Sequence, residues 1–250
     1  MYPARRIRSH GITASACEPR YARAVLGRSW HGAIAVLVLA GLCVQVAIAV
    51  QAPASPPAHA VGTLAGAAVA GRMVRVLSFF TIQSNILAAI TSAQLARNPD
   101  SDGRIWRVVR LDALFGITVT GIVYTTVLAR IHEPKGWEQV STNVVFHYIV
   151  PLATVLGWLA FGPRRRVDAR VILWSLVWPV LWFAYTLIRG AASKWHPYPF
   201  VDASSHGYPQ VLVNALLVTL VLGAVAALFW LGDRKLPSGR QVATARVPAD

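Results

Sequence analysis

The chain has 250 residues and a formal net charge of +14, yet only 14% of its residues are charged and 55% are hydrophobic. Apolar runs of about 20 residues dominate this composition and place the chain among the integral membrane proteins. Its arginines and lysines lie in short clusters between apolar runs rather than in one patch. That distribution is typical of membrane topology and argues against a nucleic-acid-binding surface.

Six apolar runs are long enough to cross a lipid core as helices, which takes about 20 residues. They lie near residues 30–50, 74–96, 111–130, 144–162, 170–190 and 210–231. We therefore predict an all-α membrane bundle of six transmembrane helices over residues 29–232. The flanking segments 1–28 and 233–250 are predicted to be disordered cytoplasmic tails.

The distribution of positive charge predicts the topology. From the N-terminal tail to the C-terminal tail, successive segments outside the apolar runs carry 6, 2, 4, 2, 4, 2 and 4 lysines and arginines. Because positive residues favour the cytoplasmic side, both termini are predicted to be cytoplasmic in a multi-pass protein of the cell membrane. The first run precedes AVQAPA, which is similar to a signal-peptide cleavage site. Its length of about 20 residues nevertheless favours an uncleaved span.

The sequence contains no motif typical of a metal site. Its two cysteines are Cys17, in the basic tail, and Cys43, within the first apolar run, and there is no His-Glu-x-x-His pattern. No metal or cofactor is therefore expected. The oligomeric state does not follow from the sequence.

The second run contains SFFTIQSNILAAI (78–90), in which four polar residues fall within the five positions from Thr81 to Asn85. Polar groups within a membrane span usually face the bundle interior. The run enters from outside, which places Thr81 about 10 Å below the outer boundary at 1.5 Å per residue. The fourth run also enters from outside and carries His147 near its start. Thr81 and His147 are therefore predicted to meet at one depth.

Pro151 lies four residues after His147 and lacks a backbone N–H. It leaves the carbonyl of His147 without a helical partner, which predicts a kink or a bound water at this level. A neutral histidine can accept a proton and act as a base. A purely structural hydrogen bond is equally compatible with the sequence.

Further polar residues gather at the predicted outer ends of the spans. Arg189 is a candidate for binding a substrate carboxylate, or for pairing with lipid headgroups or with Asp202. The loop WHPYPFVD (195–202) is stiffened by its prolines. It fits either a lid over a cavity or a well-packed extracellular loop. Asp202 at its end is a candidate for orienting the imidazole of His147.

Three stretches carry a resemblance to a known family: SFFTIQSNILAAI, FHYIVPLATVLGWLAFGPR and YTLIRGAASKWHPYPFVD. Over about residues 30–232 the chain resembles the androgen-induced and androgen-dependent six-helix membrane proteins, in a bacterial branch of that superfamily. The resemblance implies an intramembrane hydrolase of fatty-acid esters with a threonine nucleophile and a histidine. The matching positions are Thr81, after two phenylalanines, and His147, before Pro151.

The expected function is therefore hydrolysis of a lipid ester by Thr81 and His147 in the outer half of the bilayer. Its expected partners are membrane lipids and an amphiphilic ester substrate. A histidine base would activate the weakly nucleophilic hydroxyl, and an oxyanion would need hydrogen-bond donors. Asn85, Tyr185 and Arg189 are the candidates for substrate binding and for those donors. The alternatives are a non-catalytic binding protein or transporter for a small amphiphile, and a structural membrane protein in which the polar residues only link helices.

Overall fold

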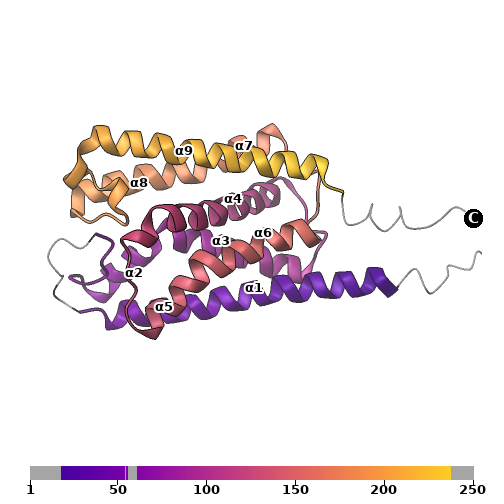
Figure 1. Cartoon of the computed structure of the whole chain (residues 1–250), viewed down its shortest axis with the longest axis horizontal. Helices are drawn as coiled ribbons and strands as arrows, with labels where there is room; N and C mark the ends of the chain where they lie inside the picture. Colours follow the sequence, from indigo (N-terminus) through magenta and orange to yellow (C-terminus); the bar gives the residue numbers. More distant parts are fainter. Residues whose placement is uncertain (1–17, 54, 56–60, 238–250) are drawn as a thin grey trace, which may run out of the picture.

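The computed structural model describes residues 18–53, 55 and 61–237, and this part of the chain contains helices and no strand (Figure 1). The helices are α1 (Glu18–Gln51), α2 (Val69–Ser78), α3 (Phe80–Arg97), α4 (Arg104–Thr126), α5 (Gly136–Val144), α6 (Val150–Phe161), α7 (Ala169–Ser175), α8 (Val177–Ser193) and α9 (Ala203–Lys235). Single turns of 3-10 helix lie at Leu128–Arg130 and Pro199–Val201, and a π-turn lies at Val145–Ile149.

Within the described residues, five helical segments are long and apolar enough to cross a membrane, and α2 with α3 would make a sixth if counted as one bent span. The five are Tyr21–Gln51, Arg104–Arg130, Gly136–Phe161, Ala169–Ser193 and Ala203–Lys235. The described part of the chain is thus all-helical, with five to six helices of membrane-spanning length. The start of α1 and the end of α9 lie at the same end of the bundle (Figure 1).

The second predicted span is not one continuous helix, so the prediction of a single run over residues 74–96 is wrong. The chain bends by 74° between α2 and α3, and Phe79 at the bend has extended backbone angles. Arg72 shows why α2 departs from the axis of α3. Its guanidinium donates to the carbonyls of Ala49 and Val50 near the end of α1, at 3.4 and 3.0 Å. Because these carbonyls lack helical partners at a C-terminus, the arginine anchors α2 beside that end.

Two layers make up the bundle. Helices α1, α3, α4 and α6 pack around a core that includes Val38, Ala88, Ile117 and Val150, all fully buried. The α8–α9 pair forms a second layer beside α4 (Figure 1). The site described below lies where these two layers meet.

The helices extend into segments that were predicted to be tails. α1 begins at Glu18, inside the predicted tail 1–28, and α9 continues to Lys235, past residue 232. Apolar side chains such as Val25 and Leu26 continue the helical run before residue 29. The remaining tail predictions, for residues 1–17 and 238–250, and Cys17 with them, lie outside the described residues. Cys43 is a free, exposed cysteine.

Candidate functional site

The bend between α2 and α3 places Thr81 at the start of a helix instead of in the middle of one. It is the second residue of α3 and is 8% exposed. Its Oγ1 lies 3.4 Å from Nε2 of His147, which confirms the predicted contact between the two side chains. This separation is at the long end of a hydrogen bond, as is common for catalytic pairs without substrate.

Hydrogen bonding fixes the tautomer of His147. Its Nδ1 lies 3.1 Å from the backbone carbonyl oxygen of Asn143. A carbonyl only accepts hydrogen bonds, so Nδ1 carries the proton and Nε2 of the neutral ring is an acceptor. The Thr81 hydroxyl therefore donates to Nε2. The ring of Tyr124 stacks on the imidazole at a centroid distance of 3.9 Å and limits its rotation.

A local irregularity of the helix surrounds His147. Residues Val145–Ile149 form a π-turn between α5 and α6, at the level where Pro151 predicted a kink or a bound water. Proline requires a departure from α-helical geometry because it has no N–H to donate. A Cβ built on Gly121 of α4 would lie 3.1 Å from Cβ of Pro151. The glycine therefore lets α4 pack closely against this turn.

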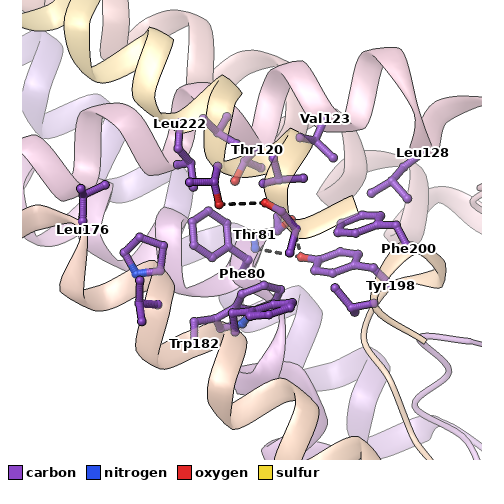
Figure 2. A pocket seen from close by; sticks show the side chains of 18 residues that line it. Phe80, Thr81, Thr120, Val123, Leu128, Leu176, Trp182, Tyr198, Phe200 and Leu222 are labelled. Atoms are coloured by element: carbon purple, nitrogen blue, oxygen red, sulfur yellow. Dashed lines mark hydrogen bonds between the residues drawn. The ribbon is translucent and has the colours of Figure 1, made fainter. Parts of the chain in front are cut away.

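Tyr198 completes the site, and the sequence reasoning did not identify it. Its hydroxyl oxygen lies 3.1 Å from Thr81 Oγ1 and accepts a hydrogen bond from the backbone N–H of Thr81, also at 3.1 Å. In Figure 2, Tyr198 points toward Thr81 across the end of the cavity. The only signal in the sequence was the proline-stiffened loop WHPYPFVD, which fits a lid and a packed loop equally well.

The loop that carries Tyr198 is anchored on several sides. Nδ1 of His196 lies 3.0 Å from a carboxylate oxygen of Asp202, and both side chains are buried. Trp195 Nε1 donates to the carbonyl of Thr63 at 2.8 Å. The guanidinium of Arg189 lies over the Trp195 ring at 4.4 Å. Tyr198 is thus held by a rigid segment.

Two groups in this loop have shifted pKa values. Burial raises the pKa of Tyr198 to about 12, despite opposing hydrogen bonds from Thr81 and Phe80. For Asp202, burial alone would raise the pKa. Hydrogen bonds from Ser204 and Ser205, with a contribution from His196, outweigh it and hold the pKa below its ordinary value. Tyr198 therefore stays a hydrogen-bond donor, and Asp202 stays ionised at neutral pH.

The other predicted site residues lie around the site but do not reach the Thr81 hydroxyl. Asn85 is fully buried, and its Nδ2 donates to the carbonyls of Thr81 and Phe146 at 2.9 and 3.4 Å. The Tyr185 hydroxyl lies 2.8 Å from Ser78 Oγ. These contacts hold the backbone on either side of the α3 start.

The remaining two predictions concern Arg189 and Asp202. Arg189 stacks on Trp195, and Asp202 contacts His196 and accepts hydrogen bonds from Ser204 and Ser205. The partner that orients His147 is the Asn143 carbonyl. The alternatives of an Arg189–Asp202 ion pair and of an Asp202–His147 contact are therefore replaced by these partners.

An apolar cavity of about 220 Å³ has Thr81 in its wall, between α4, α8 and α9. No charged side chain is among the described residues that line it. Tyr198 and Phe200 lie at one end, and Leu176 lies at the other (Figure 2). Val180 and Thr219 line the cavity but are also exposed on α8 and α9, so the cavity reaches the outer surface of the second layer.

Searches against family models, curated proteins and solved structures find no match to this chain. Among the described residues, no group of three or more histidine, cysteine or acidic side chains is placed to hold a metal ion. The site's chemistry is therefore argued from its own side chains. It consists of a hydroxyl, an imidazole acceptor and a phenol beside a space that fits a hydrocarbon chain.

Proposed function

We propose that the protein is a membrane-embedded hydrolase of carboxylic esters, with Thr81 as nucleophile and His147 as base. The observation that carries the proposal is the hydrogen-bonded series Tyr198, Thr81, His147, of which Thr81 and Tyr198 line an uncharged cavity. A threonine hydroxyl is a weak nucleophile and needs a neighbouring base. The cavity would hold the acyl chain of an amphiphilic lipid ester that enters laterally from the membrane.

The reaction follows from the hydrogen-bond directions. Thr81 Oγ bonds to the ester carbonyl carbon, its proton passes to Nε2 of His147, and the carbonyl π electrons move onto the oxygen. The bond to the leaving alcohol then breaks, and the alcohol oxygen takes the proton from Nε2. Water repeats the same steps, which releases the carboxylic acid and restores Thr81. The Asn143 carbonyl supports the transient imidazolium through Nδ1–H.

Purified full-length protein in detergent micelles tests this proposal with p-nitrophenyl octanoate and with a fluorophosphonate reagent. We expect turnover and labelling of the wild type and a loss of at least about 100-fold for Thr81→Ala and for His147→Ala, because each removes an essential step. The control variants are Thr125→Ala, whose hydroxyl bonds only to backbone carbonyls, and His206→Ala, which is exposed. Unchanged labelling of Thr81→Ala would refute the nucleophile.

The second candidate is a binding protein or transporter for a small amphiphile. The uncharged cavity that reaches the surface of α8 and α9 favours it, because ligand sites are mostly apolar with few polar groups. A fluorescent fatty ester distinguishes the two functions. Stable binding without turnover by the wild type, unchanged in Thr81→Ala, would support the second candidate.

We also propose that both termini are cytoplasmic in the cell membrane, which places the site in the outer half of the bilayer. The alternating counts of lysine and arginine support this orientation. A membrane-impermeant maleimide on intact cells tests it in a background in which both cysteines are replaced, Cys17→Ser and Cys43→Ser. His206→Cys, near the site, should react, and Arg104→Cys, at the start of α4, should not. The reverse pattern would invert the topology.

A further inference from the structure

We propose that Tyr198 is a catalytic residue, whose hydroxyl donates a hydrogen bond to the oxyanion that forms when Thr81 attacks an ester carbonyl. This inference rests on the proposed function and extends it by one residue. It assigns the oxyanion donor to the loop between α8 and α9 instead of to the predicted candidates Asn85, Tyr185 and Arg189. The directions of the hydrogen bonds carry the argument.

Each hydrogen bond around Thr81 has a defined direction. The backbone N–H of Thr81 can only donate, so the Tyr198 oxygen accepts it at 3.1 Å. The Thr81 hydroxyl donates its single proton to Nε2 of His147. The remaining contact, 3.1 Å between the two hydroxyl oxygens, must then use the phenol proton. Tyr198 thus donates to the oxygen that attacks the substrate.

Attack creates a negative charge on the carbonyl oxygen, two bonds away from the attacking Oγ of Thr81. Once Thr81 Oγ is bonded to the carbonyl carbon, it becomes a weak acceptor, while the former carbonyl oxygen becomes an anion on that same carbon. The phenol proton already points at Oγ, so a small rotation about the tyrosine C–O bond redirects it to the oxyanion. Tyr198 keeps its proton throughout, and only the acceptor changes.

The start of α3 strengthens this donor. The backbone N–H of Thr81 donates to the phenol oxygen. It is among the N–H groups that a helix leaves free in its first turn, where the helix dipole is positive. A hydroxyl that accepts such bonds is polarised and donates more strongly. The helix therefore acts on the oxyanion through Tyr198.

The surroundings of Tyr198 hold the donor in place before substrate arrives. The ring is buried against Phe79 at a centroid distance of 5.6 Å and stacks on Phe200 at 5.2 Å. The His196–Asp202 contact fixes the loop on both sides of it. Preorganised donors of this kind stabilise a developing charge without reorganising during the reaction.

Tyr198→Phe tests the inference, because it removes one oxygen and keeps the packed ring. With p-nitrophenyl octanoate we expect kcat to fall about 10²- to 10³-fold, as for the loss of one oxyanion donor, while KM changes less than about threefold. An alkyl trifluoromethyl ketone forms a tetrahedral adduct with a hydroxyl nucleophile, so its inhibition constant should rise in parallel. Tyr208→Phe, which changes a half-exposed tyrosine of α9, is the matched control and should behave as wild type.

The outcomes separate the inference from the function on which it rests. If Thr81→Ala is inactive but Tyr198→Phe keeps more than about a third of the wild-type kcat, Tyr198 is not the oxyanion donor and the hydrolase survives. A rise in KM with unchanged kcat would also overturn the inference, because that pattern indicates that Tyr198 only binds the substrate in its ground state. If wild type and Thr81→Ala do not differ, both proposals fail.

Discussion

The cavity predicts a limit on the acyl chain that the enzyme accepts. Trp182 packs against Phe80, next to Thr81, with ring centroids 5.2 Å apart, and Leu176 closes the far end (Figure 2). Leu176, the residue before α8, precedes Trp182 by six positions, which corresponds to roughly 9 Å at 1.5 Å per residue. A hydrocarbon zigzag advances about 1.25 Å per carbon, so roughly seven carbons fit beyond the carbonyl. Wild-type activity should therefore peak near octanoyl esters.

Phenylalanine has three more side-chain carbons than leucine, so Leu176→Phe should shorten the space for the acyl chain by about three carbons. Each methylene that enters an apolar site contributes about 0.8 kcal/mol, so an octanoyl chain should lose about 2.4 kcal/mol, or roughly 60-fold in kcat/KM. Butanoyl esters, which do not reach Leu176, should react at the wild-type rate. The optimum should move from about eight carbons to about five.

A series of p-nitrophenyl esters from four to sixteen carbons measures both profiles. Leu173→Phe is the matched control, because it makes the same substitution outside the cavity. Leu173 is 67% exposed on α7. The profile of this variant should equal that of the wild type. If Leu176→Phe lowers kcat/KM equally for butanoyl and octanoyl esters, the acyl chain does not lie in this cavity.

Three further predictions concern stability, measured as the melting temperature in detergent. Gly190→Ala should lower the free energy of unfolding by about 1–3 kcal/mol, because the new Cβ would lie 2.1 Å from Nε2 of the buried His196. Gly223→Ala is the control: its Cβ would meet nothing within 4 Å, so its melting temperature should equal or exceed that of the wild type. Asp202→Asn should lower the melting temperature at pH 7. The difference should begin to shrink as the pH falls below about 4, the ordinary pKa of the carboxyl, and should be lost as the pH passes the lower pKa of the folded protein. A difference that stays constant across this range would contradict this account. Asn85→Leu should cost about 1–3 kcal/mol through the lost hydrogen bond to the Thr81 carbonyl, and an unchanged melting temperature would show that this bond contributes nothing.

The helical character of the spans and the common level of Thr81 and His147 along their helices could be predicted because few physical rules determine them. Span length follows from membrane thickness, and depth follows from the rise per residue once the direction of each span is assigned. The turn at His147 was also predictable, since Pro151 removes a donor that a regular helix requires. These predictions depend on local sequence and on the membrane, not on which helices become neighbours.

The bend at Phe79 and the role of Tyr198 were not predictable in the same way. Nothing in FFT marks a helix start, and the contacts that hold α2 in its bent position, such as those of Arg72 with carbonyls near the end of α1, are tertiary. Tyr198 reaches Thr81 across 117 positions of sequence. A loop of alternating prolines and aromatics indicates stiffness, but its direction is set by tertiary contacts such as those of Trp195 and His196.

The two irregular points in the helices together explain how the site is built. Backbone groups freed at a break in a membrane helix must find partners, because lipid offers none. At the start of α3 the N–H of Thr81, in the first turn of the helix, donates to the Tyr198 hydroxyl, and just before the π-turn the carbonyl of Asn143 accepts a hydrogen bond from Nδ1 of His147. Each break thus orients one member of the site. Continuing α2 into α3 as a regular helix would give the Thr81 N–H a helical partner and remove its bond to Tyr198, so the bend and the proposed chemistry depend on the same hydrogen bond.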